Sequence, residues 1–468
     1  MKILSITVSY ISSRYIHFVR MLVGFFTHGH ERSIRAKRNI AATIVIKGLS
    51  IATGLILVPL TINYLDPTKY GIWITLSSIL HWFSFFDIGL GNGLRNRFAE
   101  ALASGKHHLA KTYVSTTYAV LSIIIGGVLI LFYIINPFLN WSRILNTGED
   151  IAFQTELSVL ALIVFTFFCL QFVFKLITTI LISDQRPAKA SLFDLMGKIL
   201  SLILIFILTK TTTGSLLYLA ITFSSVPVLV LMISSLWFYN RKYKRYRPSL
   251  KSIDFSKTKD LMNLGIKFFI IQIAAVLLYQ TNNIIISQLF GPAEVTPYNV
   301  AFKYFNVLMM GFAIILTPFW SAFTEAWVKK EISWIRNSIK KLVGLWGLLL
   351  IAGIIMLVFS KWVYAVWIGE KVQVSFSISA LVCAWVLLNA WNGIFSHFLN
   401  GVGKIKLQLY IGITAAVLNV PLALFLGNKI GIEGVLTANL LVKIFGVWIY
   451  PLQSFKLINN KATGLWKK

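Results

Sequence analysis

Residues 40–64 read IAATIVIKGLSIATGLILVPLTINY, an apolar run in which the only charged side chain is Lys47. A helix of about twenty such residues crosses a bilayer core that is about 30 Å thick. Runs of the same kind recur along the chain, for example at residues 112–135, 157–182, 342–359 and 407–426. Lipid offers no partner to a free backbone N–H or C=O group, so each run is expected to be helical. The sequence therefore predicts an all-α membrane protein with about twelve transmembrane helices.

The composition excludes the other broad classes of fold. Hydrophobic residues make up 57% of the 468 residues and charged residues only 13%, whereas roughly 45–50% of an ordinary soluble domain is apolar. A transmembrane β-barrel would show strands of about ten residues with alternating polarity, and no stretch of this sequence follows that pattern. A helical membrane bundle is the class that remains.

The formal net charge of +28 could indicate a nucleic-acid-binding protein, but the positions of the basic residues argue against that. We expect the spans to start near residues 40, 70, 112, 155, 188, 214, 263, 297, 339, 376, 405 and 432. Lys and Arg are then about five times as frequent in the segments on one side of the membrane as on the other. This excess predicts an inner-membrane protein in which both termini and the loop from Arg241 to Lys259 are cytoplasmic. The same residues can also attract anionic lipid headgroups.

The N-terminal segment and the cysteines carry little functional information. Residues 3–26 are apolar but contain Arg14, His17 and Arg20, which disfavours both a cleavable signal peptide and a span. An interfacial amphipathic helix is the better prediction there, and Met21 is an alternative start. Cys169 and Cys383 both fall within expected spans, so they do not form a disulfide framework.

The chain repeats itself weakly. Asp66-Pro67 after the first span matches Gly291-Pro292 after the seventh, and Phe98-Ala99-Glu100 matches Phe323-Thr324-Glu325. Two repeats of six helices each have the same orientation in the membrane. The predicted domains are a basic segment at residues 1–38, six-helix bundles at 39–239 and 263–456, a basic linker at 240–262 and a tail at 457–468.

Six basic residues lie within the expected spans: Lys47, Lys175, Lys198, Lys267, Lys303 and Lys443. A charge at the middle of a bilayer costs about 2.5–3.5 kcal/mol on insertion scales, so such residues usually face the interior of the bundle. Lys267 lies near the edge of its span and can extend its ammonium group to the surface. Asp194 precedes Lys198 by one helical turn, and this pair is either structural or part of a site.

Polar stripes accompany two of these lysines. Ser50, Gly54 and Thr61 share one helix face with Lys47, and Asn306, Met310, Thr317 and Ser321 follow Lys303 on the eighth span. The seventh span adds Gln272, Asn282 and Asn283, and the second has His81, which is either a packing residue or a cavity residue. These residues predict a cationic cavity, with Lys443, Lys175 and Lys198 as further members. Lysine binds phosphate as a compact point charge, and amides suit sugar hydroxyls. The other interpretation is that the lysines bond to backbone carbonyls.

One region resembles a known family. YGIW at residues 70–73, FDIGLGNGLRNRFAEA at 86–101 and YVST at 113–116 resemble the second helix and following loop of bacterial polysaccharide (O-antigen) flippases. These proteins belong to the multidrug/oligosaccharidyl-lipid/polysaccharide exporter superfamily. The NGVGK loop at residues 400–404 extends the resemblance more loosely. No strand precedes the glycine-rich run, so it is not a nucleotide-binding loop.

The resemblance implies a carrier that moves undecaprenyl-diphosphate-linked oligosaccharide to the outer leaflet by alternating access, with polysaccharide polymerase machinery as a further partner. It implies a V-shaped cavity between the two bundles, lined by helices 1, 2, 7 and 8. By position, Lys47, Lys303 and Arg95 would hold the diphosphate, although this chain offers lysines where the family offers arginines. Asp87 and Glu325 are the acids most suited to coupling or gating. Neither a metal nor a cofactor is predicted, and H⁺ or Na⁺ coupling is left open.

Two other functions compete with this one. A multidrug exporter of the same fold would bind organic cations through buried acids, but the first span has Lys47 and no acid. A membrane glycosyltransferase, polymerase or ligase would need paired carboxylates and a sizeable external loop. The external loops are short and hold scattered acids such as Glu149 and Asp150. The sequence does not identify the oligosaccharide or the oligomeric state.

Overall fold

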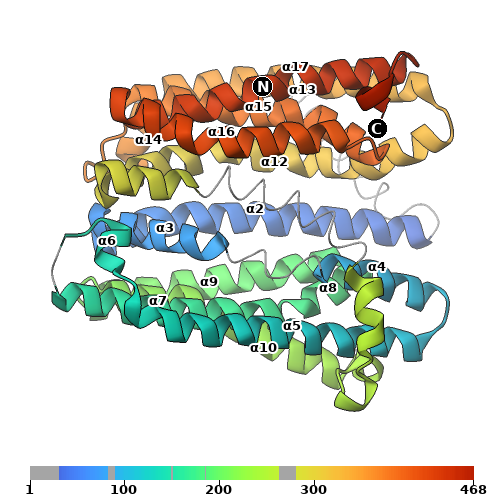
Figure 1. The fold of residues 1–468 in the computed structure, drawn as a ribbon, viewed down its shortest axis with the longest axis horizontal. Helices are drawn as coiled ribbons and strands as arrows, with labels where there is room; N and C mark the ends of the chain where they lie inside the picture. The colour runs from blue at the N-terminus through green and yellow to red at the C-terminus, as the bar shows by residue number, and fades with distance from the viewer. Residues whose placement is uncertain (1–30, 83–89, 149–150, 185, 263–280, 468) are drawn as a thin grey trace, which may run out of the picture.

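The computed structural model describes residues 31–82, 90–148, 151–184, 186–262 and 281–467, and in these ranges the fold is entirely helical (Figure 1). Ten of the described helices are long and apolar enough to cross a membrane. The second and seventh predicted spans contain undescribed residues, so the ten helices agree with the predicted twelve. The first half comprises α2 (Glu31–Leu65), α3 (Pro67–Trp82), α4 (Leu90–Ala103), α5 (His107–Ile135), α6 (Trp141–Leu145), α7 (Ile151–Phe174), α8 (Leu176–Ser183), α9 (Pro187–Thr211) and α10 (Leu216–Asn240). The second comprises α12 (Val295–Val328), α13 (Ile332–Val358), α14 (Ser360–Trp367), α15 (Phe376–Gly401), α16 (Lys406–Ile430) and α17 (Ile432–Ile458).

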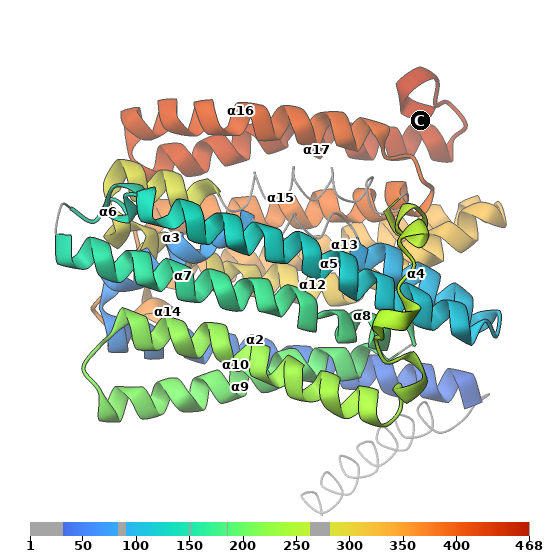
Figure 2. The same ribbon diagram turned by 60° about the horizontal axis from the view of Figure 1, so that its bottom comes forward.

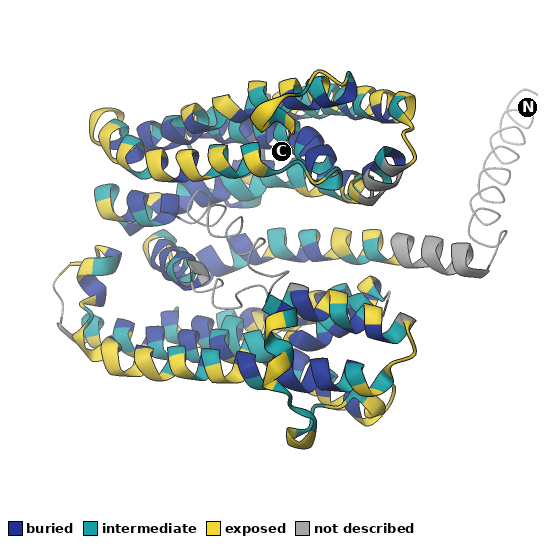
Figure 3. Cartoon of the chain, turned by 45° about the vertical axis from the view of Figure 1, so that its right-hand side comes forward, coloured by how far each residue is buried: buried dark blue, intermediate teal, exposed yellow. Residues whose placement is uncertain are grey.

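The two halves form two bundles, as predicted. One apolar core is built from residues between Leu57 and Leu261, and two others come from residues after Asn283. Large apolar side chains such as Ile130, Leu348 and Trp448 are exposed, as expected where lipid would cover them. Figure 3 shows that exposed residues recur along the outer helices of both bundles. The predicted domain boundaries remain a prediction, and the interfacial helix expected at residues 3–26 lies outside the described residues.

Helix α2 begins at Glu31, well before the predicted start near residue 40. Arg and Lys residues occupy these additional turns. Such residues are good helix formers, so the helix continues beyond the apolar segment, whereas the hydropathy pattern marks only the part that lipid surrounds.

The matching turns of the two repeats adopt related backbone conformations. Asp66 has a φ of 97° and Gly291 a φ of 93°, in the region that most residues avoid. Each is followed by a proline that opens a helical segment, where its fixed φ suits the first turn. The Asp66 carboxylate also accepts a hydrogen bond from the Lys69 N–H at 2.9 Å. These short turns return the chain at one end of the molecule.

The bundles touch each other at that end. We call it the closed end, and we call the opposite end, which carries residues 241–262, the linker end (Figures 1 and 2). Among the described residues, every hydrogen bond recorded between the halves lies toward the closed end. Thr296 Oγ1 donates to the Pro67 carbonyl at 2.6 Å, and Ser287 Oγ donates to the Leu145 carbonyl at 3.0 Å. An apolar cluster drawn from both halves lies there too: Val58, Ile62, Tyr70, Val300, Tyr364, Ile368 and Val372.

The linker is fastened to the first bundle. Tyr243 OH donates to Asp184 at 2.7 Å, and Lys242 forms an ion pair with the same carboxylate. Burial raises the pKa of the Asp184 carboxyl, but the hydrogen bonds from Lys242 and Tyr243 outweigh it, so the pKa lies below its ordinary value. Further along the linker, the Asp254 N–H donates to Thr116 Oγ1 at 3.0 Å. Within the described residues, the hydrogen bonds of the linker therefore connect it to the first bundle.

Gly71 provides a test of the closed end. A Cβ at this position would lie 1.7 Å from the Pro292 carbonyl oxygen, so only glycine lets α3 approach the second bundle this closely. We predict that Gly71→Ala destabilises the protein by about 1–3 kcal/mol, as overpacking does, and lowers its melting temperature in detergent.

Gly127→Ala on α5 is the matched control, because nothing lies within 4 Å of a Cβ there. Alanine should be neutral or slightly stabilising at this helical position. Equal melting temperatures for the two variants would contradict the close contact between Gly71 and Pro292.

Candidate functional site

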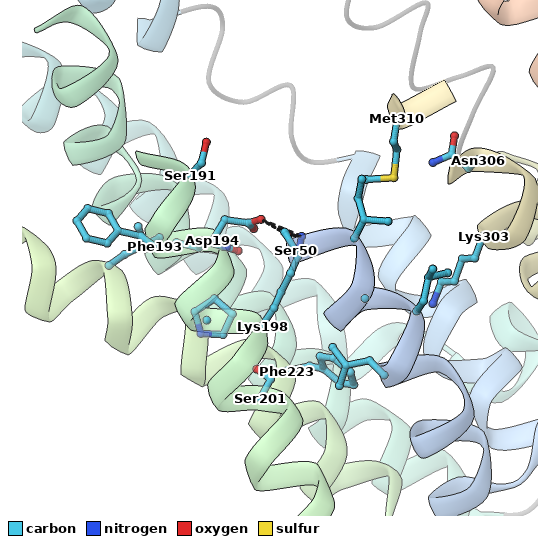
Figure 4. A pocket seen from close by; sticks show the side chains of 18 of the residues that line it. Ser50, Ser191, Phe193, Asp194, Lys198, Ser201, Phe223, Lys303, Asn306 and Met310 are labelled. Carbon is cyan, nitrogen blue, oxygen red and sulfur yellow. Dashed lines mark hydrogen bonds and ion pairs between the residues drawn. The ribbon is translucent and has the colours of Figure 1, made fainter. Parts of the chain in front are cut away.

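A cavity of about 690 Å³ lies between the first bundle and α12 (Figure 4). Its described lining comes from α2, α3, α7, α8, α9, α10 and α12. It extends from Tyr70 and Trp73, near the closed end, to Ile182, close to the linker end. A hollow of this size is in the range that holds a small-molecule ligand or the head of a larger one.

Helical spacing brings the polar residues onto the lining. Ser50, Gly54 and Thr61 project from one face of α2, and Lys303, Asn306 and Met310 project from one face of α12. Part of each stripe predicted from the sequence therefore lines this cavity, whereas Lys47 and Thr317 are exposed outside the described lining and the side chain of Ser321 lies outside the described residues. Thr61 uses its hydroxyl to donate to the Leu57 carbonyl at 2.6 Å, which satisfies that buried group.

A three-membered polar cluster connects α2 with α9. Lys198 Nζ donates to Asp194 Oδ2 at 2.8 Å and to Ser50 Oγ at 2.7 Å. Ser50 Oγ in turn donates to the same Asp194 oxygen at 3.0 Å. The Asp194 side chain is 61% exposed and that of Lys198 is 37% exposed, so both remain accessible from the cavity. Figure 4 shows the cluster on the lining.

Two further ammonium groups face the same hollow. Lys303 Nζ donates to Tyr70 OH at 2.8 Å and lies 5.4 Å from the centre of the Tyr70 ring. Lys175 lies at the junction of α7 and α8, and its side chain is exposed. No described residue forms a recorded hydrogen bond or ion pair with the Lys175 ammonium group. The described lining therefore combines three lysines with the single carboxylate of Asp194.

Aromatic rings form another part of the wall. Trp73 stacks on Phe223 with ring centroids 5.6 Å apart and an interplanar angle of 20°. Both rings line the cavity together with Phe193. Flat apolar faces of this kind can pack against the C–H face of a sugar ring, while Asn306 and Gln171 supply amide groups for its hydroxyls. The cavity offers positive charge, amides and aromatic faces within one space.

The other predicted site residues have different surroundings. Lys47 lies one turn before Ser50, toward the linker end, and its side chain is exposed outside the described lining. Arg95 is exposed on α4, a helix that lies at the linker end (Figure 1). Asp87 and Gln272 lie outside the described residues, as do the side chains of His81 and Glu325.

Lys443 belongs to a separate polar cluster inside the second bundle. Its ammonium group donates to Asn389 and lies 5.2 Å from the centre of the Trp385 ring. Nearby, the Asn439 amide donates to Asn282 at 2.9 Å. Asn283 instead donates to Ser78 Oγ on α3 at 2.7 Å, so it joins the two bundles. The structure thus separates Lys443, Asn282 and Asn283 from the described cavity lining.

Several lining residues were missed at the sequence level. Gln171, Thr178 and Ile182 flank Lys175 on one face of the α7–α8 segment, and Tyr70 and Trp73 come from α3. The spacing of Gln171, Lys175, Thr178 and Ile182 follows the helical period and could have revealed this stripe. In the described ranges no group of three or more His, Cys, Asp or Glu side chains could hold a metal ion.

Comparisons with known proteins agree with these features. The family profile described as "Polysaccharide biosynthesis protein" matches residues 36–322. A protein of Salmonella typhi named as an O-antigen transporter is 25% identical over 287 residues, which are 59% of this chain and 63% of that protein. The chain therefore spans less than two thirds of that relative. A Salmonella typhimurium protein with the same name is 23% identical over 407 residues, which are 84% of this chain and 89% of the relative.

A solved structure shares the fold. It is described as an inward-facing conformation of a multidrug resistance MATE family transporter of the MOP superfamily. The TM-score is 0.74 at 14% sequence identity, and the match covers 91% of this chain and 100% of that one. This likeness establishes the arrangement of helices in two bundles.

The cavity predicts that a cysteine on its lining reacts faster than a cysteine on the outer surface of the bundle. The thiolate is the reactive form of cysteine, and it forms in water but not in hydrocarbon. We predict that Asn306→Cys, on the cavity lining, reacts at least about tenfold faster with a water-soluble maleimide than Leu348→Cys, which is exposed on the outer face of α13.

Mass spectrometry of the labelled protein measures both rates. The natural cysteines give little background, because Cys169 and Cys383 are only 2% and 3% exposed. Equal rates at the two engineered positions would mean that water does not fill the cavity.

Proposed function

Because this chain belongs to the polysaccharide biosynthesis protein family, we propose that it carries a lipid-linked oligosaccharide from one leaflet of a membrane to the other. The substrate is an undecaprenyl diphosphate bearing an O-antigen unit or a similar surface polysaccharide unit. The names of the Salmonella relatives support this choice of substrate class. The protein acts as a transporter and not as an enzyme.

The observation that carries the proposal is the convergence of Lys175, Lys198 and Lys303 on one cavity. A diphosphate diester has two negative charges, and ammonium groups bind phosphate oxygens through charge-assisted hydrogen bonds. In the proposed complex the lysines hold the diphosphate, Asn306 and Trp73 contact the sugar, and the lipid tail stays in the bilayer. Lys47 and Arg95, which lie toward the linker end, would attract the head as it approaches.

Transport proceeds by alternating access. The described contacts between the bundles lie toward the closed end, which supports a cavity that is entered from the linker end. Rocking of the second bundle against the first would separate these contacts and close the linker end behind the substrate. The linker supports this motion, because the hydrogen bonds of its described residues fasten it to the first bundle.

The linker end faces the cytoplasm in this mechanism. The basic residues between Arg241 and Lys259 lie at this end, as the positive-inside rule requires for an inner-membrane protein. Each negative charge that leaves a negative cell interior gains about 2.3 kcal/mol per 100 mV, so the field assists export of the anionic head. H⁺ or Na⁺ coupling through Asp87 or Glu325 is a separate proposal.

The competing functions fit the site less well. A multidrug exporter shares the fold, but an organic cation would meet three ammonium groups and one carboxylate on the described lining. A polymerase or glycosyltransferase would need two carboxylates at the reaction centre, and the described lining has only Asp194.

Lys303→Gln tests the proposal. The amide of glutamine can still donate to Tyr70, so the fold should be preserved while the charge is lost. Removing a hydrogen bond to a charged group costs about 1.5–3 kcal/mol, so we expect flipping to slow about tenfold or more. The assay uses vesicles that hold the purified protein and a fluorescent lipid-diphosphate oligosaccharide, with an impermeant reductant that bleaches only the outer leaflet.

Lys210→Gln is the matched control, because Lys210 is exposed at the far end of α9 and lies outside the described lining. Its rate should equal that of the wild type. If the wild-type protein flips this lipid no faster than protein-free vesicles do, the proposed function is wrong.

A further inference from the structure

The proposed function leaves one cavity group without a role. Asp194 is a carboxylate in a hollow that is otherwise positive, and three ammonium groups on the described lining outnumber it. An acid repels an anionic substrate, so a simple anion site would gain by losing it. Its position against Lys198 and Ser50 indicates what it contributes.

We propose that Asp194 is an exchangeable internal counter-ion, which pairs with Lys198 when the cavity is empty and is displaced from it by the diphosphate of the substrate. This inference rests on the proposed function and assigns a specificity-determining role to a residue of the same site. It concerns a change of partner for Lys198, and no covalent bond is made or broken.

The geometry favours exchange over a permanent ion pair. The Asp194 and Lys198 side chains are 61% and 37% exposed, so water screens their attraction. Exposed ion pairs of this kind contribute little to stability. A diphosphate approaching from the cavity reaches Lys198 and can bind Lys175 or Lys303 as well, whereas Lys198 is the one lysine of the described lining that forms an ion pair with Asp194. The substrate therefore outcompetes the carboxylate without a large cost.

The charges explain why a diphosphate suits the site. Three ammonium groups and one carboxylate give the described lining a net charge of two positive units. A diphosphate diester carries two negative charges and neutralises it, whereas a monophosphate diester carries one and leaves an unpaired charge. Asp194 thus matches the net charge of the cavity to that of a diphosphate. After the substrate is released, Asp194 pairs with Lys198 again while the empty carrier returns.

The exchange of partners also affects α2, the helix that lies between the bundles. Ser50 on α2 bonds to both members of the pair on α9, at 3.0 Å to Asp194 and 2.7 Å to Lys198. When the substrate draws Lys198 away, this connection between α2 and α9 weakens. Helix α2 lies between the bundles (Figure 1), so occupation of the site loosens a contact next to the moving boundary.

Asp194→Asn separates the exchange from a structural role. Without the competing charge, the variant should bind the diphosphate about fivefold more tightly, yet flip it at least about fivefold more slowly, because nothing re-pairs Lys198 after release. A structural role predicts that affinity and rate both fall. Two probes are compared: N-acetylglucosamine joined to geranylgeraniol through a diphosphate, and the same pair joined through a monophosphate. Calorimetry measures the affinity of each probe for the full chain in nanodiscs of phosphatidylethanolamine and phosphatidylglycerol.

Three further variants complete the test. Asp194→Glu should restore the wild-type affinity and rate. Asp194→Asn should tighten binding less in a Lys198→Gln background than in the wild type, because part of the effect of the carboxylate acts through that lysine. Glu433→Gln is the matched control, since Glu433 accepts a hydrogen bond from Ser377 at 2.6 Å far from the cavity, and it should change neither quantity.

The outcomes distinguish the two proposals. If the wild type binds the diphosphate probe at least about tenfold better than the monophosphate, and Asp194→Asn binds more tightly but flips more slowly, the exchange is supported. If the wild type binds the diphosphate and Asp194→Asn binds it equally or less tightly, the exchange is wrong while the proposed function stands. If the wild type binds neither probe, the proposed function is wrong, and the exchange, which rests on it, is wrong too.

Discussion

The close approach of α3 to Pro292 is the constraint on which the rest of the structure depends. A bundle of apolar helices gains no hydrophobic stabilisation from association inside lipid, so close backbone packing and hydrogen bonds must hold the halves together. Gly71 permits that packing, and the Thr296 hydroxyl adds a hydrogen bond beside it. Because the described contacts between the bundles gather toward this end, the space on the other side of them can form a cavity.

The cavity in turn makes the charged residues tolerable. An ammonium group facing lipid would cost several kcal/mol, but one facing a hollow that reaches the linker end can remain solvated. Lys175, Lys198 and Lys303 all take this position. In the second bundle, Lys443 is stabilised differently, by a hydrogen bond to Asn389 and by the face of the Trp385 ring. The ammonium groups are therefore stabilised in two ways, by an accessible cavity in the first bundle and by protein partners in the second.

The surroundings of these lysines show which features of the structure could be predicted from the sequence. Hydropathy sufficed for the ten described spans, and helical periodicity placed Ser50, Gly54 and Thr61 on one cavity with Lys303, Asn306 and Met310. Periodicity alone did not reveal how deep the hollow extends along a helix, so Lys47 and Ser50 share a face while only Ser50 joins the described lining. Nor could it reveal the surroundings of Lys443, because its partner Asn389 lies on another helix, 54 residues away in the sequence. Asp194, by contrast, lies one turn before Lys198 on the same helix, so that pair was predictable.

The use of lysine on the described cavity lining suits a site that must release what it binds. Arginine presents a rigid fork that grips a carboxylate or a phosphate through two parallel hydrogen bonds, whereas lysine is a strongly hydrated point charge on a flexible stem. An arginine at position 198 would hold Asp194 more firmly when the cavity is empty and the diphosphate more firmly when it is full. Both effects would slow a carrier that must exchange one anion for the other in every cycle. A lysine next to a screened carboxylate keeps the two states close in free energy, and that balance favours turnover over tight binding.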